Sequence, residues 1–450
     1  MVGRSMGRWF AFACLFLLAP VVSPGAEGGL SREEKVRADR ARVESEGFWI
    51  YNDLPRAFQE AEQTGKPILV SLRCIPCEEC VKLDDELIDQ DPVIRPLLKK
   101  FVCVRVVGTN GLDLSTFQYD TDQSFAMFML NADKTIYGRF GTRSHRTDWL
   151  GDVSLEGMAA ALEGTLQLHA KYPAIRDRLT GKRGDALEFP APEDFPSLRE
   201  KYTDRLNYSG NVVQSCIHCH QIGDARRDFY WHQGQAIPEE LLFPYPHPKS
   251  IGLILDPKQR AKVSEIQSDT PASRSGLRKG DEIVSLDGQP LLSMADVQWV
   301  LNQQDSGGTS LDWVARREGQ LVRGQLVLDK GWRRLDNPRW RVAAWGLCRM
   351  MTGGMRLEAL DEEERIKQSI PDGQMALRVT HAGKYGDHAT ARRAGIRPGD
   401  IVVAYDGQTD LKREADLFAY ASENRRIGDR VTVRYRRDGS ERTLQIPIQK

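Results

Sequence analysis

The segment with the most specific chemistry holds two cysteines and two histidines within five residues. It reads Cys216-Ile217-His218-Cys219-His220, a Cys-x-x-Cys-His pattern. Two thiols at this spacing form thioethers to the two vinyl groups of one porphyrin, and the histidine that follows lies where its imidazole reaches the iron. The pattern therefore predicts a covalent c-type haem held by Cys216, Cys219 and His220.

The other ligand of that iron has two local candidates. No methionine occurs between Met158 and Met294, so the usual methionine ligand is missing, and His232 and His247 remain. A bis-histidine or five-coordinate iron is therefore expected. Zinc is the alternative cofactor, bound by the two cysteines and two of the three histidines, although the histidine spacing is unlike that of a zinc finger.

A second group of cysteines follows a short apolar run near the N-terminus. Cys74, Cys77 and Cys80 form a Cys-x-x-Cys-x-x-Cys series. Cys77 can pair with Cys74 or with Cys80, so one disulfide always leaves one thiol free. A redox-active dithiol is the main interpretation. An iron–sulfur or other metal site and a structural cluster are the alternatives.

Export from the cytoplasm is compatible with both groups of cysteines. Arg4 and Arg8 precede an apolar run over 9–22, and small residues follow up to Ala26. This predicts a signal peptide over 1–26, with a retained N-terminal anchor as the alternative. No later stretch is long and apolar enough to span a bilayer. We expect a soluble periplasmic or otherwise exported protein.

The length and charge of the chain restrict its class. The chain has 450 residues, too many for one core, so several domains are expected. Its formal net charge is +0, and no basic block points to a nucleic-acid partner.

The elements around the first cysteine group follow a familiar order. A polar helix capped by Ser31 is expected within 27–47. It precedes a helix that ends at Gly65, the strand 68–72, the cysteines at the mouth of a helix, the strand 101–107, a hairpin over 125–137 and the helix 152–171. This order resembles the thioredoxin-like fold over 48–178. The resemblance implies an α/β domain and a possible thiol–disulfide oxidoreductase activity at Cys74, Cys77 and Cys80.

Two less regular segments follow this domain. Residues 179–205 are rich in Gly, Pro and charge, which predicts a linker. Residues 206–249 hold the haem motif in a short, mostly helical and irregular segment. That segment is too short to enclose a haem by itself, so a neighbouring domain is expected to cover one edge.

The C-terminal part contains an internal repeat. Gly280-Asp281 and Asp287-Gly288 recur at a constant offset as Gly399-Asp400 and Asp406-Gly407. An internal repeat of this kind predicts two copies of one domain. Both copies are similar to PDZ domains of the bacterial protease-associated type, which are β-rich α+β folds. The first copy spans 250–332, and the second, with a connector, spans 333–450.

The resemblance to PDZ domains implies binding of peptide or protein C-termini by strand addition. The binding loops would contain Ile251, Gly252 and Leu253 in the first copy, and Gly354 and Met355 in the second. Such domains often accompany a serine protease. The sequence has no Gly-x-Ser-x-Gly motif, so it predicts that the chain is not a protease.

The combined hypothesis is an exported redox protein for electron transfer or redox sensing. Its haem and cysteine cluster would carry electrons, and its PDZ pair would hold a partner. One alternative is a thiol–disulfide oxidoreductase that recruits substrates through its PDZ domains. The other is a non-redox PDZ scaffold with a structural metal.

Overall fold

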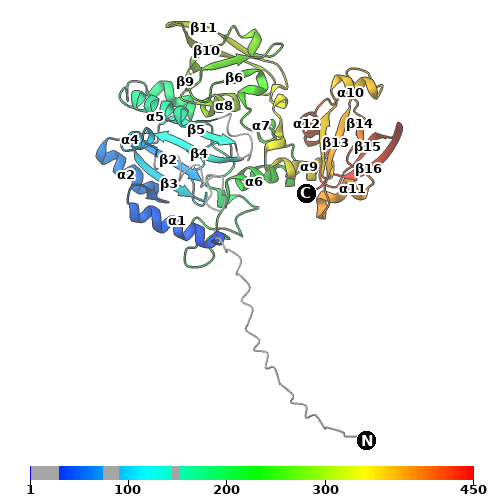
Figure 1. Ribbon diagram of the computed structural model, residues 1–450, viewed down its shortest axis with the longest axis horizontal. Helices are drawn as coiled ribbons and strands as arrows, with labels where there is room; N and C mark the ends of the chain where they lie inside the picture. Colours follow the sequence, from blue (N-terminus) through cyan, green and yellow to red (C-terminus); the bar gives the residue numbers. More distant parts are fainter. Residues whose placement is uncertain (2–29, 74–90, 144–152) are drawn as a thin grey trace.

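The computed structural model describes residues 1, 30–73, 91–143 and 153–450. The signal-peptide prediction therefore lies outside the described residues. The first repeat packs on the thioredoxin-like domain, and helices α6 and α9 lie between that domain and the second repeat (Figure 1). Within the described ranges, no helix has the length and apolarity needed to cross a membrane.

The thioredoxin-like domain contains one mixed sheet with strand order β1-β3-β2-β4-β5. Strands β1, β3 and β2 are parallel, and β4 and β5 are antiparallel. Every residue of β2 and β3 is buried, as expected for parallel strands covered on both faces. The elements are α1 (Arg32–Glu46), β1 (Ile50–Tyr51), α2 (Leu54–Thr64), β2 (Ile68–Arg73), α4 (Ile94–Leu98), β3 (Val102–Val107), β4 (Gln123–Leu130), β5 (Ile136–Arg143) and α5 (Leu155–His169).

The helix ends follow the predicted local signals. Ser31 caps α1 in a reciprocal capping box with Glu34. Gly65 ends α2 at φ 66°, a left-handed conformation that costs glycine little. The predicted strand, hairpin and closing helix are all present in the described residues.

Residues 179–205 are not the exposed linker that their composition predicts. They contain two short 3₁₀ helices, η3 (Arg176–Lys182) and η4 (Pro192–Asp194). Phe195 and Leu198 are buried in the core of the thioredoxin-like domain, and Lys182 is fully buried. The apolar and aromatic residues between the glycines and prolines give this segment a packed face, so it folds against the domain.

The segment after it joins two cores. Helix α6 (Cys219–His232) contributes Ile222 and Ala225 to the thioredoxin-like core and Trp231 to the core of the second repeat. The short helix α7 (Glu239–Leu242) also packs on the second repeat. This segment is therefore a bridge rather than a separate domain.

The first repeat has a four-stranded sheet, β11-β10-β8-β9, and a separate two-stranded sheet, β6-β7. Helix α8 lies between the repeat and β5 of the thioredoxin-like domain. The elements are η5 (Pro248–Ile251), β6 (Leu253–Leu255), β7 (Val263–Ile266), η6 (Ala272–Arg274), β8 (Glu282–Leu286), β9 (Gln289–Pro290), α8 (Met294–Asn302), β10 (Thr309–Arg317) and β11 (Gln320–Leu328).

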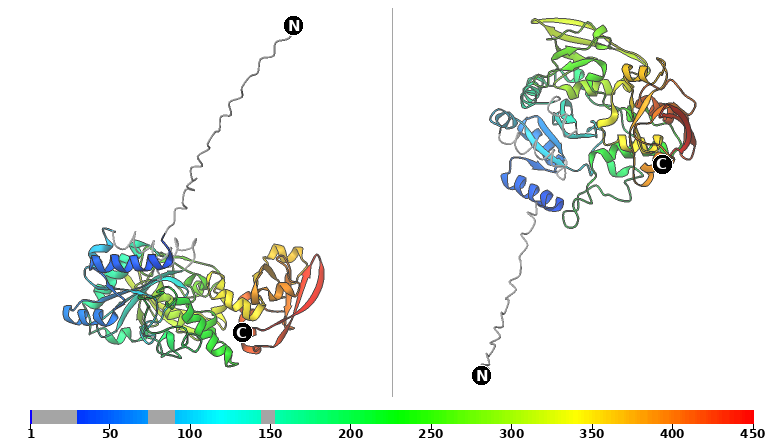
Figure 2. Two further views of the ribbon diagram at one scale, coloured as in Figure 1. Left: turned by 90° about the horizontal axis from the view of Figure 1, so that it is seen from below. Right: turned by 45° about the vertical axis from the view of Figure 1, so that its right-hand side comes forward.

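The second repeat has one five-stranded sheet, β12-β13-β14-β15-β16. It lies at one end of the molecule, beside α9 (Figure 2). The elements, with their connector, are η7 (Trp332–Leu335), η8 (Pro338–Trp340), α9 (Ala344–Thr352), β12 (Met355–Ala359), α10 (Glu362–Lys367), β13 (Leu377–Ala382), η9 (Gly386–Ala389), α11 (Thr390–Arg393), β14 (Ile401–Tyr405), α12 (Glu414–Asn424), β15 (Arg430–Arg437) and β16 (Ser440–Pro447).

Candidate functional site

The predicted haem motif lies at the start of α6, against the thioredoxin-like domain. The Ile217 N–H donates to Asn110 Oδ1 over 2.9 Å, and the Thr109 N–H donates to Ile217 O over 3.0 Å. Thr109 and Asn110 come shortly after β3 ends. The backbone of the motif is therefore held along the edge of the sheet where the parallel strands end.

Both sulfurs of the motif face the thioredoxin-like domain. Cys216 is 7% exposed, and a Cβ at Gly108 would lie 2.9 Å from its Sγ. Cys219 is partly buried against the core of that domain. Burial raises the pKa of Cys216 to about 12, and burial also raises the pKa of Cys219. Both thiols are therefore protonated at neutral pH.

A porphyrin needs open space beside each thioether. Cys216 is only 7% exposed, so the packing at this sulfur does not fit an attached haem. Covalent haem stays a prediction of the sequence, which an absorption spectrum of the reduced protein tests.

The histidines do not complete a metal site in this arrangement. His220 and His232 lie near opposite ends of α6, roughly 18 Å apart along its axis. His247 is 2% exposed, and its Nδ1 accepts from the Lys249 N–H over 3.0 Å. Among the residues with described positions, no group of three or more metal-binding side chains gathers. The zinc alternative therefore does not fit either.

The cysteine series Cys74, Cys77 and Cys80 lies outside the described residues. The predicted redox or metal role of these three thiols therefore stays a prediction.

The predicted peptide loop of the first repeat is part of its core. Ile251 is 0% exposed and Leu253 is 1% exposed. Gly252 has φ 80°, and an added Cβ would meet Thr270 Oγ1 at 2.1 Å. This loop is closely packed.

The helix of the first repeat that would line a peptide groove is locked to the thioredoxin-like domain. Lys182 Nζ lies 2.8 Å from Asp296 Oδ1, and both side chains are 0% exposed. The same carboxylate accepts the N–H of Arg139 on β5 over 3.1 Å. A buried ion pair of this kind ties η3, β5 and α8 together.

Strand β5 is an edge strand, with a neighbouring strand on one side only. On its open side, polar groups of α8 and its N-cap residue bond the backbone of β5. The Ser293 hydroxyl donates to Arg139 O over 2.5 Å, and the Arg139 guanidinium stacks on the Trp299 ring at 3.6 Å. Trp299 Nε1–H in turn donates to Gly181 O over 2.9 Å. The first repeat therefore covers an edge that would otherwise be open to another strand.

Leu292 fits between two glycines of the thioredoxin-like domain. A Cβ at Gly138 would lie 2.7 Å from Leu292 Cδ1, and one at Gly164 would lie 2.7 Å from Leu292 Cδ2. The absence of side chains at these two positions lets α8 approach β5 and α5 closely.

Strand β12 of the second repeat lies at the edge of its sheet, just as β6 of the first repeat pairs only with β7. Strand β12 pairs with β13 on one side, and α12 begins on its other side. The Leu360 N–H donates to Ala376 O beside β13, whereas the Leu357 N–H donates to Glu414 Oε1 over 2.6 Å. Because N–H groups alternate in direction along a strand, the N–H of Ala359 points to the same side as that of Leu357.

Glu414, the first residue of α12, is the acidic group at this edge. It is 6% exposed, and its Oε2 has no hydrogen-bond partner in the described structure. Burial raises the pKa of Glu414 to about 7, against the hydrogen bond from Leu357 and the nearby Arg339 and Arg356. The thiol of Cys348 on α9 lies 3.9 Å from Oε1.

The predicted loop of the second repeat is also packed. The Gly354 N–H donates to Cys348 O over 2.9 Å, which completes the C-terminal end of α9. Met355 is 0% exposed. An added Cβ at Gly354 would lie 1.9 Å from His388 O, so only glycine fits here.

A second buried ion cluster holds the connector that leads to α9. Arg341 Nη1 lies 2.7 Å and 2.8 Å from the two carboxylate oxygens of Asp120. Asp122 Oδ1 accepts the N–H of Ala343, the N-cap residue of α9, over 3.2 Å. Arg341 also donates to Pro244 O. The thioredoxin-like domain thus holds the N-terminal end of the helix whose C-terminal end forms the loop of the second repeat.

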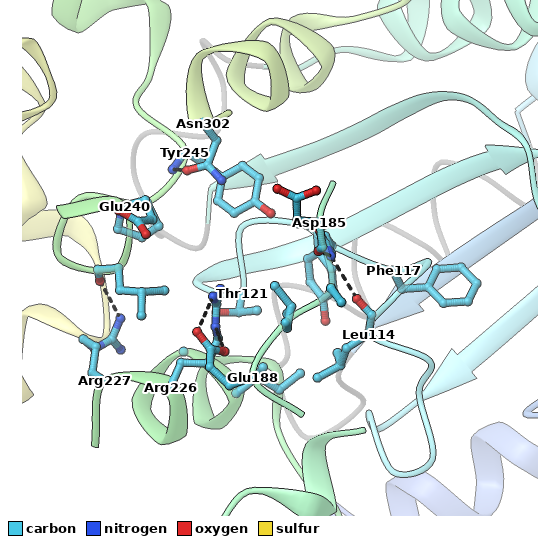
Figure 3. Close-up of a pocket in the computed structure, with 18 of the residues that line it drawn as sticks. Leu114, Phe117, Thr121, Asp185, Glu188, Arg226, Arg227, Glu240, Tyr245 and Asn302 are labelled. Carbon is cyan, nitrogen blue, oxygen red and sulfur yellow. Dashed lines mark hydrogen bonds and ion pairs between the residues drawn. The ribbon is translucent and has the colours of Figure 1, made fainter. Parts of the chain in front are cut away.

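A cavity of about 300 Å³ lies where the thioredoxin-like domain, α6, α7 and α8 meet (Figure 3). Arg226 forms a bidentate pair with Glu188, at 2.7 Å and 2.9 Å, and the Tyr230 hydroxyl donates to the same carboxylate over 3.0 Å. The Tyr245 ring points into the cavity (Figure 3). The charge of Arg226 is neutralised by Glu188, so it does not select an anionic ligand.

Sequence reasoning missed Glu414, Asp296, Lys182, Asp120 and Arg341. An acidic residue in the first turn of each repeated helix was the available signal for the first two, although they occupy different positions of that turn. Lys182, Asp120 and Arg341 belong to no sequence motif.

Comparisons with known proteins confirm the modules. A thioredoxin-like family model matches residues 49–132, and a PDZ domain model matches 249–322 and 386–448. The chain therefore contains one thioredoxin-like domain and two PDZ domains, as the sequence predicts. The second PDZ match begins after β12 and β13, which belong to the same sheet.

Curated relatives are bacterial and share part of the chain. One is a probable periplasmic serine endoprotease DegP-like from Pseudomonas fluorescens, 25% identical over 178 residues, 38% of this chain and 35% of the relative. Another, from Halomonas elongata, is 27% identical over 150 residues, 33% of this chain and 29% of the relative. The chain spans about a third of the length of the relatives it matches.

Solved structures give a weaker likeness. The HtrA-type protease AlgW with a decapeptide is 23% identical and covers 22% of this chain and 28% of its own, with a TM-score of 0.18. AlgW with a tripeptide is 18% identical and covers 28% of this chain and 39% of its own, also with a TM-score of 0.18.

The prediction that the chain is not a protease is contradicted by these comparisons, because the relatives are named as serine endoproteases. The prediction depended on the absence of one nucleophile motif. Serine proteases of different folds place their nucleophile in different sequence contexts, so that absence is insufficient evidence.

Proposed function

We propose that this chain is an exported peptide-binding protein whose second PDZ domain captures an extended peptide on the edge of β12. The observation that carries the proposal is that β12 pairs with one strand only and has α12 beside its other edge. Strand addition at such an edge is how PDZ domains hold peptides. The N-terminal signal pattern and the periplasmic relatives support export.

The first PDZ domain has a supporting role in this proposal. Its α8 is held against the thioredoxin-like domain by the Lys182–Asp296 ion pair and the Arg139 N–H of β5. Together with the thioredoxin-like domain it forms a platform to which the second PDZ domain is attached. Thiol–disulfide exchange at Cys74, Cys77 and Cys80 on captured peptides is the corresponding proposal for the cysteine series.

The test removes one outward N–H from the proposed binding edge. Ala359→Pro deletes this donor but keeps the Glu358 and Leu360 donors on the side of β13, so the edge strand is expected to persist. The probe is a pool of fluorescent ten-residue peptides with free C-termini and random last four residues, read by fluorescence anisotropy on the full chain.

Loss of a peptide hydrogen bond is expected to weaken binding by about threefold to tenfold in Ala359→Pro. Ala359→Ser keeps the N–H and is the matched control, with unchanged affinity expected. Equal affinity of the proline variant and the parent protein would show that β12 is not the binding edge.

A further inference from the structure

One N–H group at the edge of β12 is already hydrogen-bonded to a side chain of the same domain in the described structure. An added peptide strand needs the N–H groups of β12 for its own carbonyl oxygens. One of these, the Leu357 N–H, is held at 2.6 Å by Glu414 Oε1. A carboxylate of the chain therefore takes the position of a ligand acceptor.

We propose that Glu414 is a built-in competitor of the peptide, so that capture requires this carboxylate to leave the edge of β12. The inference rests on the proposed function of the second PDZ domain and names the regulation of that same site. Because the Leu357 N–H already has an acceptor within the chain, a peptide carbonyl must displace that acceptor, and the competition lowers peptide affinity.

The surroundings of Glu414 favour displacement of its carboxylate from the edge of β12. Its Oε2 is buried with no hydrogen-bond partner in the described structure, so one half of the carboxylate gains nothing from its position. Burial disfavours the charged form, as the raised pKa shows. The charges of Arg339 and Arg356 act on the carboxylate in its present position and favour its ionised form. The Cys348 thiol on α9 is the remaining titratable group against it.

Helix α9 links Glu414 to the thioredoxin-like domain. The helix contributes Cys348 to the Glu414 contact and ends in the Gly353–Gly354 loop. Its N-terminal end is capped by Asp122 of the thioredoxin-like domain. The closed edge is therefore held from inside the second PDZ domain and from the thioredoxin-like domain.

The test compares Glu414→Ala with the parent protein, using the same peptide pool and the full chain. Removal of the competing acceptor is expected to tighten binding by about tenfold or more. Asp416→Asn removes another acid from the first turn of α12, one that bonds the Arg413 N–H rather than β12, and is expected to bind as the parent does. Glu414→Gln, which keeps a neutral acceptor of the same shape, is expected to give an intermediate affinity and serves if the alanine variant does not fold.

The outcomes separate the inference from the proposed function. Binding by the parent protein with equal or weaker binding by both Glu414 variants overturns the inference and leaves the function standing. Absence of binding by all folded variants overturns the proposed function and the inference with it. Binding only after substitution of Glu414 supports both.

Discussion

The two PDZ domains repeat one sequence pattern and use the first turn of the same helix in different ways. In the first domain, Asp296 of α8 pairs with Lys182 through Oδ1 and accepts the N–H of Leu292 through Oδ2. In the second, Glu414 of α12 turns inward and holds the Leu357 N–H of β12. The two carboxylates occupy different positions of that turn, since Asp296 is the third residue of α8 and Glu414 the first of α12. A buried acid in the first turn thus joins two domains in one copy and bonds an edge strand in the other.

The largest effect is expected where the first PDZ domain is locked in place. Lys182→Met leaves the buried Asp296 carboxylate without its cation, which typically costs about 3–5 kcal/mol of folding free energy. Urea unfolding of the full chain, followed by circular dichroism, measures the loss. The exposed Lys171→Met is the control. An unchanged urea midpoint in Lys182→Met would mean that the Lys182–Asp296 pair does not hold the first PDZ domain in place.

A somewhat smaller effect is expected from the pH dependence of Glu414. Its pKa is raised from 4.5 to about 7 in the folded protein, so the folded state binds the proton more tightly. The stabilising contribution is complete below pH 4.5, declines as pH rises and is lost above about pH 7, with a total of about 3 kcal/mol. Unfolding midpoints between pH 4.5 and 8 test this. Glu414→Gln is expected to remove that part of the pH dependence, and a variant with the parent's pH profile would exclude Glu414 as its source.

The smallest effect is expected from the shape of the interface beside α8. Gly138→Ala places a Cβ 2.7 Å from Leu292 Cδ1, so the side chain must shift. Such overpacking typically costs about 1–3 kcal/mol. Thermal unfolding measures it, and Leu292→Ala in the same chain is expected to relieve the clash. If the double variant is no more stable than the sum of the single changes, the two residues do not share one contact.

The sequence predicts the elements whose signals are local. Ser31 and Gly65 mark helix ends by side-chain capping and by a left-handed backbone, and both mark them in the structure. The repeat is visible because each copy needs the same turns at Gly280 and Gly399. These features depend on a few neighbouring residues and are therefore readable without the fold.

The contacts between domains are not readable in this way. Arg341 and Asp120 are 221 positions apart, and neither lies in a motif. Residues 179–205 have the composition of a linker, yet their few aromatic side chains decide that the segment packs. The Cys-x-x-Cys-His spacing likewise fixes which residues are neighbours but not the direction of their side chains, and the Cys216 sulfur lies buried beside Gly108.

Helix α6 sets the distance between the thioredoxin-like core and the core of the second PDZ domain. Its 14 residues extend about 21 Å, with Ile222 embedded at one end and Trp231 at the other. An α-helix resists stretching and bending far more than a coil does, so the separation of the two cores is set by the number of helical turns. Inserting a full turn would lengthen the gap, and inserting half a turn would rotate one core relative to the other. The distance between the thioredoxin-like core and the core of the second PDZ domain is therefore set by the length of one helix.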